Sequence, residues 1–136
     1  MINKKKSNEF VKFFKNYTLT LSNTIDKINL RNLYKAANLI LKTIKKNKFI
    51  YVCGNGGSAA IANHYICDYF KGLSKYTNLK AKIKSLNSDS YLISAISNDI
   101  AYDQIFKLQA ERYMNKEDIL ILISSSGNSK NIKEVL

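Results

Sequence analysis

The sequence predicts an α/β fold in which a parallel sheet is flanked by helices and two helices come first. Residues 49–53 and 119–123 are continuous apolar runs rich in β-branched side chains, typical of strands buried in a parallel sheet. Each run leads into a loop of glycine and serine, and a helical pattern follows. Because parallel strands are joined by helical crossovers, this order indicates a three-layer domain.

Two amphipathic helices are expected ahead of the first strand. Apolar residues at helical spacing give the first helix a broad apolar face between Phe10 and Leu21. The same spacing recurs from Leu30 to Ile44, and the polar residues 45–48 end it. We therefore expect a helical part over residues 1–48 and a parallel α/β part over residues 49–136.

The elements after the first strand follow from shorter patterns. A helix is expected from Ser58 to Phe70, with Gly72 as its C-terminal stop. A weaker strand over residues 81–86 leads into a short helix that Asn98 and Asp99 end, and residues 102–114 are again helical.

The length of the chain predicts a single domain over residues 1–136. With 136 residues and 46% hydrophobic content, the chain can bury one core. A last helix begins at about Ser129, and the sequence stops about two turns later, which leaves a sheet edge unprotected. We infer a domain truncated after its third strand.

Composition excludes several classes of protein. The apolar run 119–123 is far below the ~20 residues needed to cross a bilayer, so a cytoplasmic protein without membrane contact is expected. Cys53 and Cys67 are interpreted as reduced packing residues. The net charge of +12 comes mainly from scattered lysines without interleaved arginine and aromatic residues, which favours a solvated surface over a nucleic-acid partner.

The two Gly/Ser loops, 54–58 and 124–129, are the strongest candidates for a binding site. Each follows a predicted parallel strand and leads into a helix, which is where open α/β sheets bind ligands. Glycine lets the backbone approach a ligand closely, free N–H groups at a helix start favour an anion, and serine adds hydroxyl donors. Two such loops on neighbouring strands favour phosphate binding over simple turn formation.

A dinucleotide-binding domain is the first alternative. Residues 54–59 fit the permissive G-x-G-x-x-A fingerprint. That fingerprint requires an acidic residue ~20 positions later, and residues 71–84 contain none. The dinucleotide interpretation is therefore the weaker one.

His64 and Asp68 form a second candidate constellation. They lie four residues apart on one face of the helix that starts at the glycine loop. An imidazole and a carboxylate at this spacing can share a metal ion or divide a proton transfer, although a surface hydrogen bond is the common alternative.

Together these motifs resemble the phosphoheptose isomerases of the sugar isomerase (SIS) fold. The resemblance rests on residues 53–58 with His64 and Asp68, on residues 97–99, and on residues 123–129, in the family's order and spacing. It implies an isomerisation of sedoheptulose 7-phosphate from ketose to aldose through an enediol. It also implies a homotetramer built on the first helix.

The resemblance assigns roles to individual residues. Asp68 stands where the family usually has Glu, and would be the base, a substrate contact and a zinc ligand with His64. The family's second acid/base His and a Gln ligand come from a C-terminal helix beyond the end of this sequence. The sugar phosphate would be bound by the following residues: Asn55, Gly56, Gly57, Ser58, Asn98, Asp99, Ser124, Ser125, Ser126 and Ser129.

A non-catalytic SIS binding module is the second alternative. A related bacterial SIS group binds the replication initiator protein and has a similar sequence. Retention of both loops and of His64 favours sugar-phosphate binding, because a partner-binding module has no need of Asp68 and Asp99 together.

Overall fold

The computed structural model describes residues 4–136, and the chain divides into two compact units. The first unit ends at Ala37 and the second spans Asn38–Leu136. Helix α1 (Lys4–Asp26) belongs to the first unit, and α2 (Leu30–Lys45) runs from the first into the second. Both N-terminal helices predicted from the sequence are thereby confirmed.

Helix α1 carries large apolar side chains that are exposed to solvent. They fall at the helical spacing expected from the sequence. The exposed side chains include Phe10, Phe13, Phe14, Tyr17 and Leu21.

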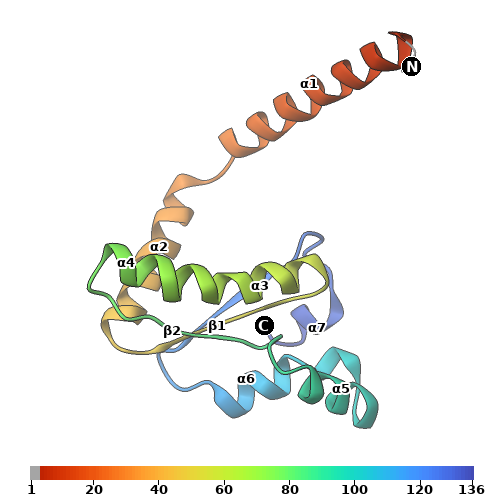
Figure 1. The fold of residues 1–136 in the computed structure, drawn as a ribbon. Coiled ribbons are helices and arrows are strands. Elements are labelled where there is room, and N and C mark those ends of the chain that lie inside the picture. Colours follow the sequence, from red (N-terminus) through yellow and green to blue (C-terminus); the bar gives the residue numbers. More distant parts are fainter. Residues whose placement is uncertain (1–3) are drawn as a thin grey trace. The chain divides into compact units, whose positions relative to one another are not determined.

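The second unit is built on a parallel sheet of the three strands β1 (Phe49–Gly54), β2 (Lys82–Ser85) and β3 (Ile119–Ile123). The order is β2-β1-β3, so the first strand of the sequence is central (Figure 1). Phe49 is in register with Lys82, and Gly54 with Ile123. The parallel sheet and its three strands agree with the sequence prediction.

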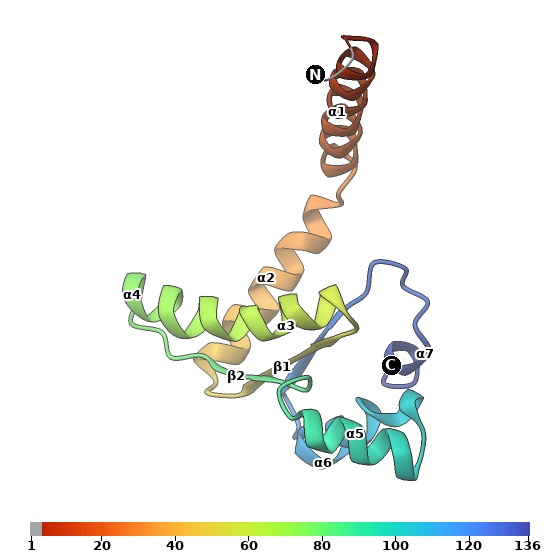
Figure 2. The same ribbon diagram turned by 45° about the vertical axis from the view of Figure 1, so that its right-hand side comes forward.

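Alternate side chains of β1 face different layers. Tyr51 and Cys53 belong to the main core, which also contains Phe106 and Ile132. Ile50 and Val52 are fully buried on the other face, against which α3 (Gly57–Cys67) packs. Figures 1 and 2 show α3 on one side of the sheet and α5 (Ser90–Asp99) with α6 (Lys107–Tyr113) on the other. The result is the expected three-layer arrangement.

The strand β3 is less buried than its apolar sequence predicts. All five of its residues are half-buried, whereas β1 is buried from Ile50 onward. The difference follows from position, because β3 pairs with β1 alone within the described sheet.

The remaining elements are short. Three of them continue or precede the helices already named: the π-helix η1 (Asp68–Leu73), α4 (Ser74–Tyr76) and the 3₁₀ turn η2 (Tyr102–Gln104). The last is α7 (Lys130–Lys133). The helix expected over residues 102–114 is thus divided into η2 and α6.

The expected helix end at Gly72 is wrong. The helical path continues from α3 through η1 to Tyr76. Gly72 lies inside the π-helical turn, where the backbone keeps a helical path without the left-handed conformation of a C-terminal glycine.

The interpretation of the two cysteines holds for one of them. Both thiols are free, and Cys53 is buried while Cys67 is exposed. Cys67 lies on the outer side of α3, so it is no packing residue. Within residues 4–136, no helix has the length and apolar content that crossing a membrane would require.

Candidate functional site

The two Gly/Ser loops begin side by side at one edge of the sheet. Gly54 ends β1 and Ile123 ends β3, and these two residues are in register. Because both strands run in the same direction, the loops that follow them leave the sheet together. The structure therefore places the two predicted binding loops next to one another.

Gly54 allows three chain segments to meet at the start of the first loop. A Cβ atom at this position would lie 2.6 Å from Cβ of Ser58 and 2.8 Å from the carbonyl oxygen of Ile123. Such distances exclude any side chain. The first turn of α3 can approach the ends of β1 and β3 because residue 54 is glycine.

Gly56 shapes the start of α3. It has φ of 52° and ψ of −120° and precedes the first helical residue, Gly57. This left-handed backbone favours glycine. The N–H groups of Ser58 and Ala59 donate to the carbonyl oxygens of Asn55 and Gly56, at 2.9 and 3.0 Å. The positive end of an eleven-residue helix dipole faces the loop, which suits an anion.

The serine loop is arranged by its own hydroxyl groups. The Gly127 N–H donates to Oγ of Ser124 and the Asn128 N–H donates to Oγ of Ser126, each at 3.1 Å. An Oγ that accepts a hydrogen bond can still donate its own proton. The loop therefore offers hydroxyl donors, and phosphate oxygens accept hydrogen bonds from such groups.

A pair of asparagine side chains joins the glycine loop to α7, the helix that follows the serine loop. Nδ2 of Asn55 donates to Oδ1 of Asn131, and Nδ2 of Asn131 donates to Oδ1 of Asn55, both at 2.8 Å. The Tyr102 hydroxyl donates to the same Oδ1 of Asn55 at 3.1 Å. Asn55 was predicted as a substrate contact, but Asn131 and Tyr102 were not predicted.

Asn87 is another residue at the site that the sequence reasoning missed. The Gly54 N–H donates to Oδ1 of Asn87 at 3.0 Å, and Nδ2 of Asn87 donates to the Gly54 carbonyl oxygen at 2.9 Å. This pair fixes the point at which the glycine loop begins. An asparagine just after a short strand was the available signal.

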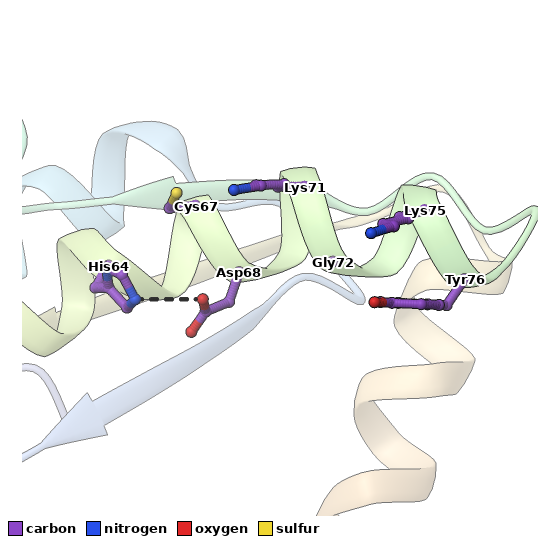
Figure 3. Close-up of a pocket in the computed structure, with 7 residues that line it drawn as sticks. All are labelled: His64, Cys67, Asp68, Lys71, Gly72, Lys75 and Tyr76. Carbon is purple, nitrogen blue, oxygen red and sulfur yellow. Dashed lines mark ion pairs between the residues drawn. The ribbon is translucent and has the colours of Figure 1, made fainter.

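His64 and Asp68 are brought together as predicted. Nε2 of His64 lies 3.3 Å from Oδ1 of Asp68, and the two side chains are 71% and 65% exposed. Figure 3 shows them pointing toward one another along the helix. They line an open pocket of about 500 Å³ together with Cys67, Lys71, Gly72, Lys75 and Tyr76.

The described residues do not make up a zinc site on their own. Zinc in proteins takes four ligands, or three with an open position. In residues 4–136 no three His, Cys, Asp or Glu side chains are grouped closely enough to hold a metal ion. His64 and Asp68 of one copy therefore do not complete the site.

Two further predicted residues, Asn98 and Asp99, end α5, and Nδ2 of Asn98 donates to Oδ1 of Asp99 at 2.8 Å. Tyr102, which contacts Asn55, follows three residues after Asp99. The side chains of Asn98 and Asp99 are exposed and lie outside the core.

Residues 12–136 match the family model described as SIS domain. The chain belongs to the SIS domain family. The structural agreement is close: a phosphoheptose isomerase structure from Neisseria gonorrhoeae superimposes with a TM-score of 0.80 at 30% identity, covering 94% of this chain and 66% of that one. The resemblance found in the sequence is thereby confirmed.

Curated relatives of this SIS domain are also phosphoheptose isomerases. The one from Helicobacter pylori strain P12 is 40% identical over 100 residues, covering 74% of this chain and 52% of the relative. The one from Aliarcobacter butzleri is 36% identical over 126 residues, covering 93% and 66%. The chain therefore spans about half to two thirds of the length of the relatives that it matches.

Proposed function

We propose that this SIS domain takes part in the isomerisation of D-sedoheptulose 7-phosphate to D-glycero-D-manno-heptose 7-phosphate, on the route to the heptose of bacterial lipopolysaccharide or capsule. The observation that carries the proposal is the adjacency of the two loops at Gly54 and Ile123. The helix that leaves the first loop also carries His64 and Asp68. The names of the relatives support the choice of substrate.

Binding of the phosphate group is assigned to the serine loop. Ser124 and Ser126 accept hydrogen bonds from the loop backbone, and each hydroxyl keeps its own proton for another acceptor. The start of α3 contributes the positive end of its helix dipole. The complete proposed set of contacts is Asn55, Gly56, Gly57, Ser58, Asp68, Asn98, Asp99, Ser124, Ser125, Ser126 and Ser129.

The proton transfer is assigned to Asp68. Its carboxylate takes the proton from C1 of the ketose, and the electron pair of that bond forms the C1–C2 double bond while a water molecule donates a proton to the C2 carbonyl oxygen. The resulting enediol gives its O1 proton back to that water, and the proton held by Asp68 returns to C2, which gives the aldose. A positioned base of this kind contributes ~10²–10⁴-fold. His64, 3.3 Å away, orients the carboxylate.

Zinc is a further part of the proposal, supported by the resemblance and by the spacing of His64 and Asp68. When bound, the ion would polarise the substrate oxygens. At least one further ligand would have to come from outside residues 4–136 of one copy. The proton transfer described above does not depend on such an ion.

A homotetramer and a cytoplasmic location complete the proposal. The exposed apolar side chains of α1, among them Phe10 and Phe13, suit a bundle with other copies of this helix. Free thiols at Cys53 and Cys67 are typical of a reducing compartment.

A non-catalytic binding module is the competing function. The exposure of His64 and Asp68 and the absence of a third metal-binding group among the described residues favour it. Such a module would recognise a ligand, or a partner such as a replication initiator, without chemistry.

Calorimetric titration with sedoheptulose 7-phosphate, with and without zinc, tests the proposal, followed by an isomerisation assay on the same sample. Binding with turnover supports the isomerase. Binding without turnover supports the recognition module, and absence of binding to the folded chain contradicts both roles for the loops. Titration with NAD is the control, since tight NAD binding would contradict the choice of ligand.

A further inference from the structure

The Asn55–Asn131 pair joins two segments that are 76 residues apart in the sequence. Asn131 is 2% exposed, and Asn55 is half-buried at the start of the glycine loop. Each side chain donates to and accepts from the other at 2.8 Å. An amide pair with both bonds formed and one member buried fixes the orientation of both side chains.

Tyr102 completes the hydrogen bonding of Asn55. Its hydroxyl donates to Oδ1 of Asn55, which then accepts two hydrogen bonds, one for each lone pair. Nδ2 of Asn55 keeps one N–H that Asn131 does not use. The side chain of Asn55 is thus a single, fixed donor rather than an adaptable amide.

Asn131 is itself held firmly by its neighbours in α7. Nζ of Lys130 lies 2.9 Å from Oδ2 of Asp103, and Ile132 is buried in the main core. Because α7 has four residues, it is too short to be stable by its own hydrogen bonds. These contacts hold the helix, and with it the end of the serine loop.

We propose that Asn131 is a positioning residue that makes the glycine and serine loops one preorganised binding surface. It acts through Asn55 and touches no substrate atom. The inference rests on the proposed function, because it takes the two loops as the binding site for a sugar phosphate. Its consequence is that the phosphate donors of residues 124–129 stay at a fixed separation from the donors of residues 55–58, which lowers the ordering cost of binding.

The first test is calorimetric titration of the full chain with sedoheptulose 7-phosphate. N131A should weaken binding about tenfold, and N55A/N131A should weaken it no more than N55A alone, because the two residues act as a unit. N78A, at an exposed asparagine before β2, is the matched control and should bind as the unaltered chain does. Undiminished binding by N131A, or additive losses in the double variant, would overturn the inference.

A pH profile of N131D separates positioning from simple loss of packing. The ionised carboxylate would face Oδ1 of Asn55, whereas its protonated form can again donate to that oxygen. Burial raises the pKa of a carboxyl group. The affinity of N131D for sedoheptulose 7-phosphate, relative to that of the unaltered chain, should therefore increase as the pH falls from about 8 to about 5. A ratio that does not change with pH would contradict the proposed hydrogen-bond role.

Hydrogen exchange of the unliganded chain gives a readout that needs no sugar phosphate. In N131A, and more weakly in Y102F, amide exchange should accelerate by a similar factor in residues 55–59 and residues 127–133. Acceleration confined to α7 would overturn the inference. The unaltered chain could bind no sugar phosphate while N131A still accelerates exchange in both loops. That result would contradict the proposed substrate and support the coupling of the loops.

Discussion

Asn87 pairs with the peptide groups of Gly54 in the way that a strand neighbour would. Its side chain accepts from the Gly54 N–H at 3.0 Å and donates to the Gly54 carbonyl oxygen at 2.9 Å. Backbone pairing of β1 with β2 ends at Val52 and Ser85, so this amide extends the pairing beyond β2. The glycine loop therefore starts from a fixed point at the edge of the sheet.

The crowding at Gly54 predicts a large loss of stability on substitution. In Gly54→Ala, the added methyl group would lie 2.6 Å from Cβ of Ser58, so the free energy of unfolding should fall by about 1–3 kcal/mol or more. Gly72→Ala is the matched control. Its Cβ would meet nothing within 4 Å in the described structure, and alanine favours the helical path by about 0.5–1 kcal/mol. Urea unfolding of both variants should therefore give shifts of opposite sign.

The serine loop predicts a specific loss of sugar-phosphate affinity. Ser124→Ala combined with Ser125→Ala should weaken binding by about 1–3 kcal/mol, because two hydroxyl donors to the phosphate are removed. Ser94→Ala, at an exposed position of α5, should leave the calorimetric affinity unchanged. Equal affinity for the double variant and the control would refute the assignment of the phosphate to this loop.

Asp68 predicts a separation of binding from turnover. Asp68→Asn keeps the size of the side chain and removes its basicity, so the isomerisation rate should fall by about 10²–10⁴-fold. Binding of sedoheptulose 7-phosphate should change much less, since the loops supply most of the contacts. If the unaltered chain turns substrate over and Asp68→Asn does so equally well, another group is the base.

The Asp103–Lys130 ion pair predicts a stability change in acid. The hydrogen bond from Lys130, and then that from Gln104, holds the pKa of Asp103 below its usual value. A carboxylate whose pKa is depressed by folding stabilises the folded chain at pH values above the unfolded pKa. This contribution is lost as the pH falls through the lower folded pKa.

Asp103→Asn should therefore flatten the decline of the melting temperature toward acid, as followed by circular dichroism. Glu117→Gln is a useful comparison, because the ion pair with Lys46 lowers the pKa of Glu117 in another part of the sheet unit. If the melting temperature falls equally steeply toward acid in Asp103→Asn and in the unaltered chain, the Asp103–Lys130 ion pair is not the source of this stability.

The two cysteines should react differently with iodoacetamide. Burial raises the pKa of Cys53 to about 12, so its thiol is protonated as well as inaccessible at about pH 8. Cys67 is exposed. Mass spectrometry of the native chain should find modification at Cys67, and none in Cys67→Ser until the chain is unfolded. Rapid modification of Cys53 in the native state would show that β1 opens readily.

The order of elements was predictable because it follows from local patterns. The apolar runs gave β1 and β3, and their Gly/Ser loops had to emerge at one sheet edge once the strands were parallel. The spacing of His64 and Asp68 placed them on one helix face, since four residues span about one helical turn. Local spacing therefore accounts for the fold and for much of the candidate site.

Side-chain pairs between distant segments could not be predicted in this way. Asn131 and Asn87 have no periodicity that indicates their partners, which lie 76 and 33 residues away. The π-helical turn at Asp68–Leu73 also has no simple sequence signal, so Gly72 was misread as a helix end. These features depend on how whole elements pack.

The central place of β1 also determines when the site can form during synthesis. Strand β1 is made before both of its partners, and Asn55 is translated 76 positions ahead of Asn131. Until the later segment leaves the ribosome, the glycine loop has its contact with Asn87 but lacks its contact with Asn131, and closing such a long interval is slow. A nascent chain should therefore gain its capacity to bind a ligand abruptly, after α7 is released, rather than in stages.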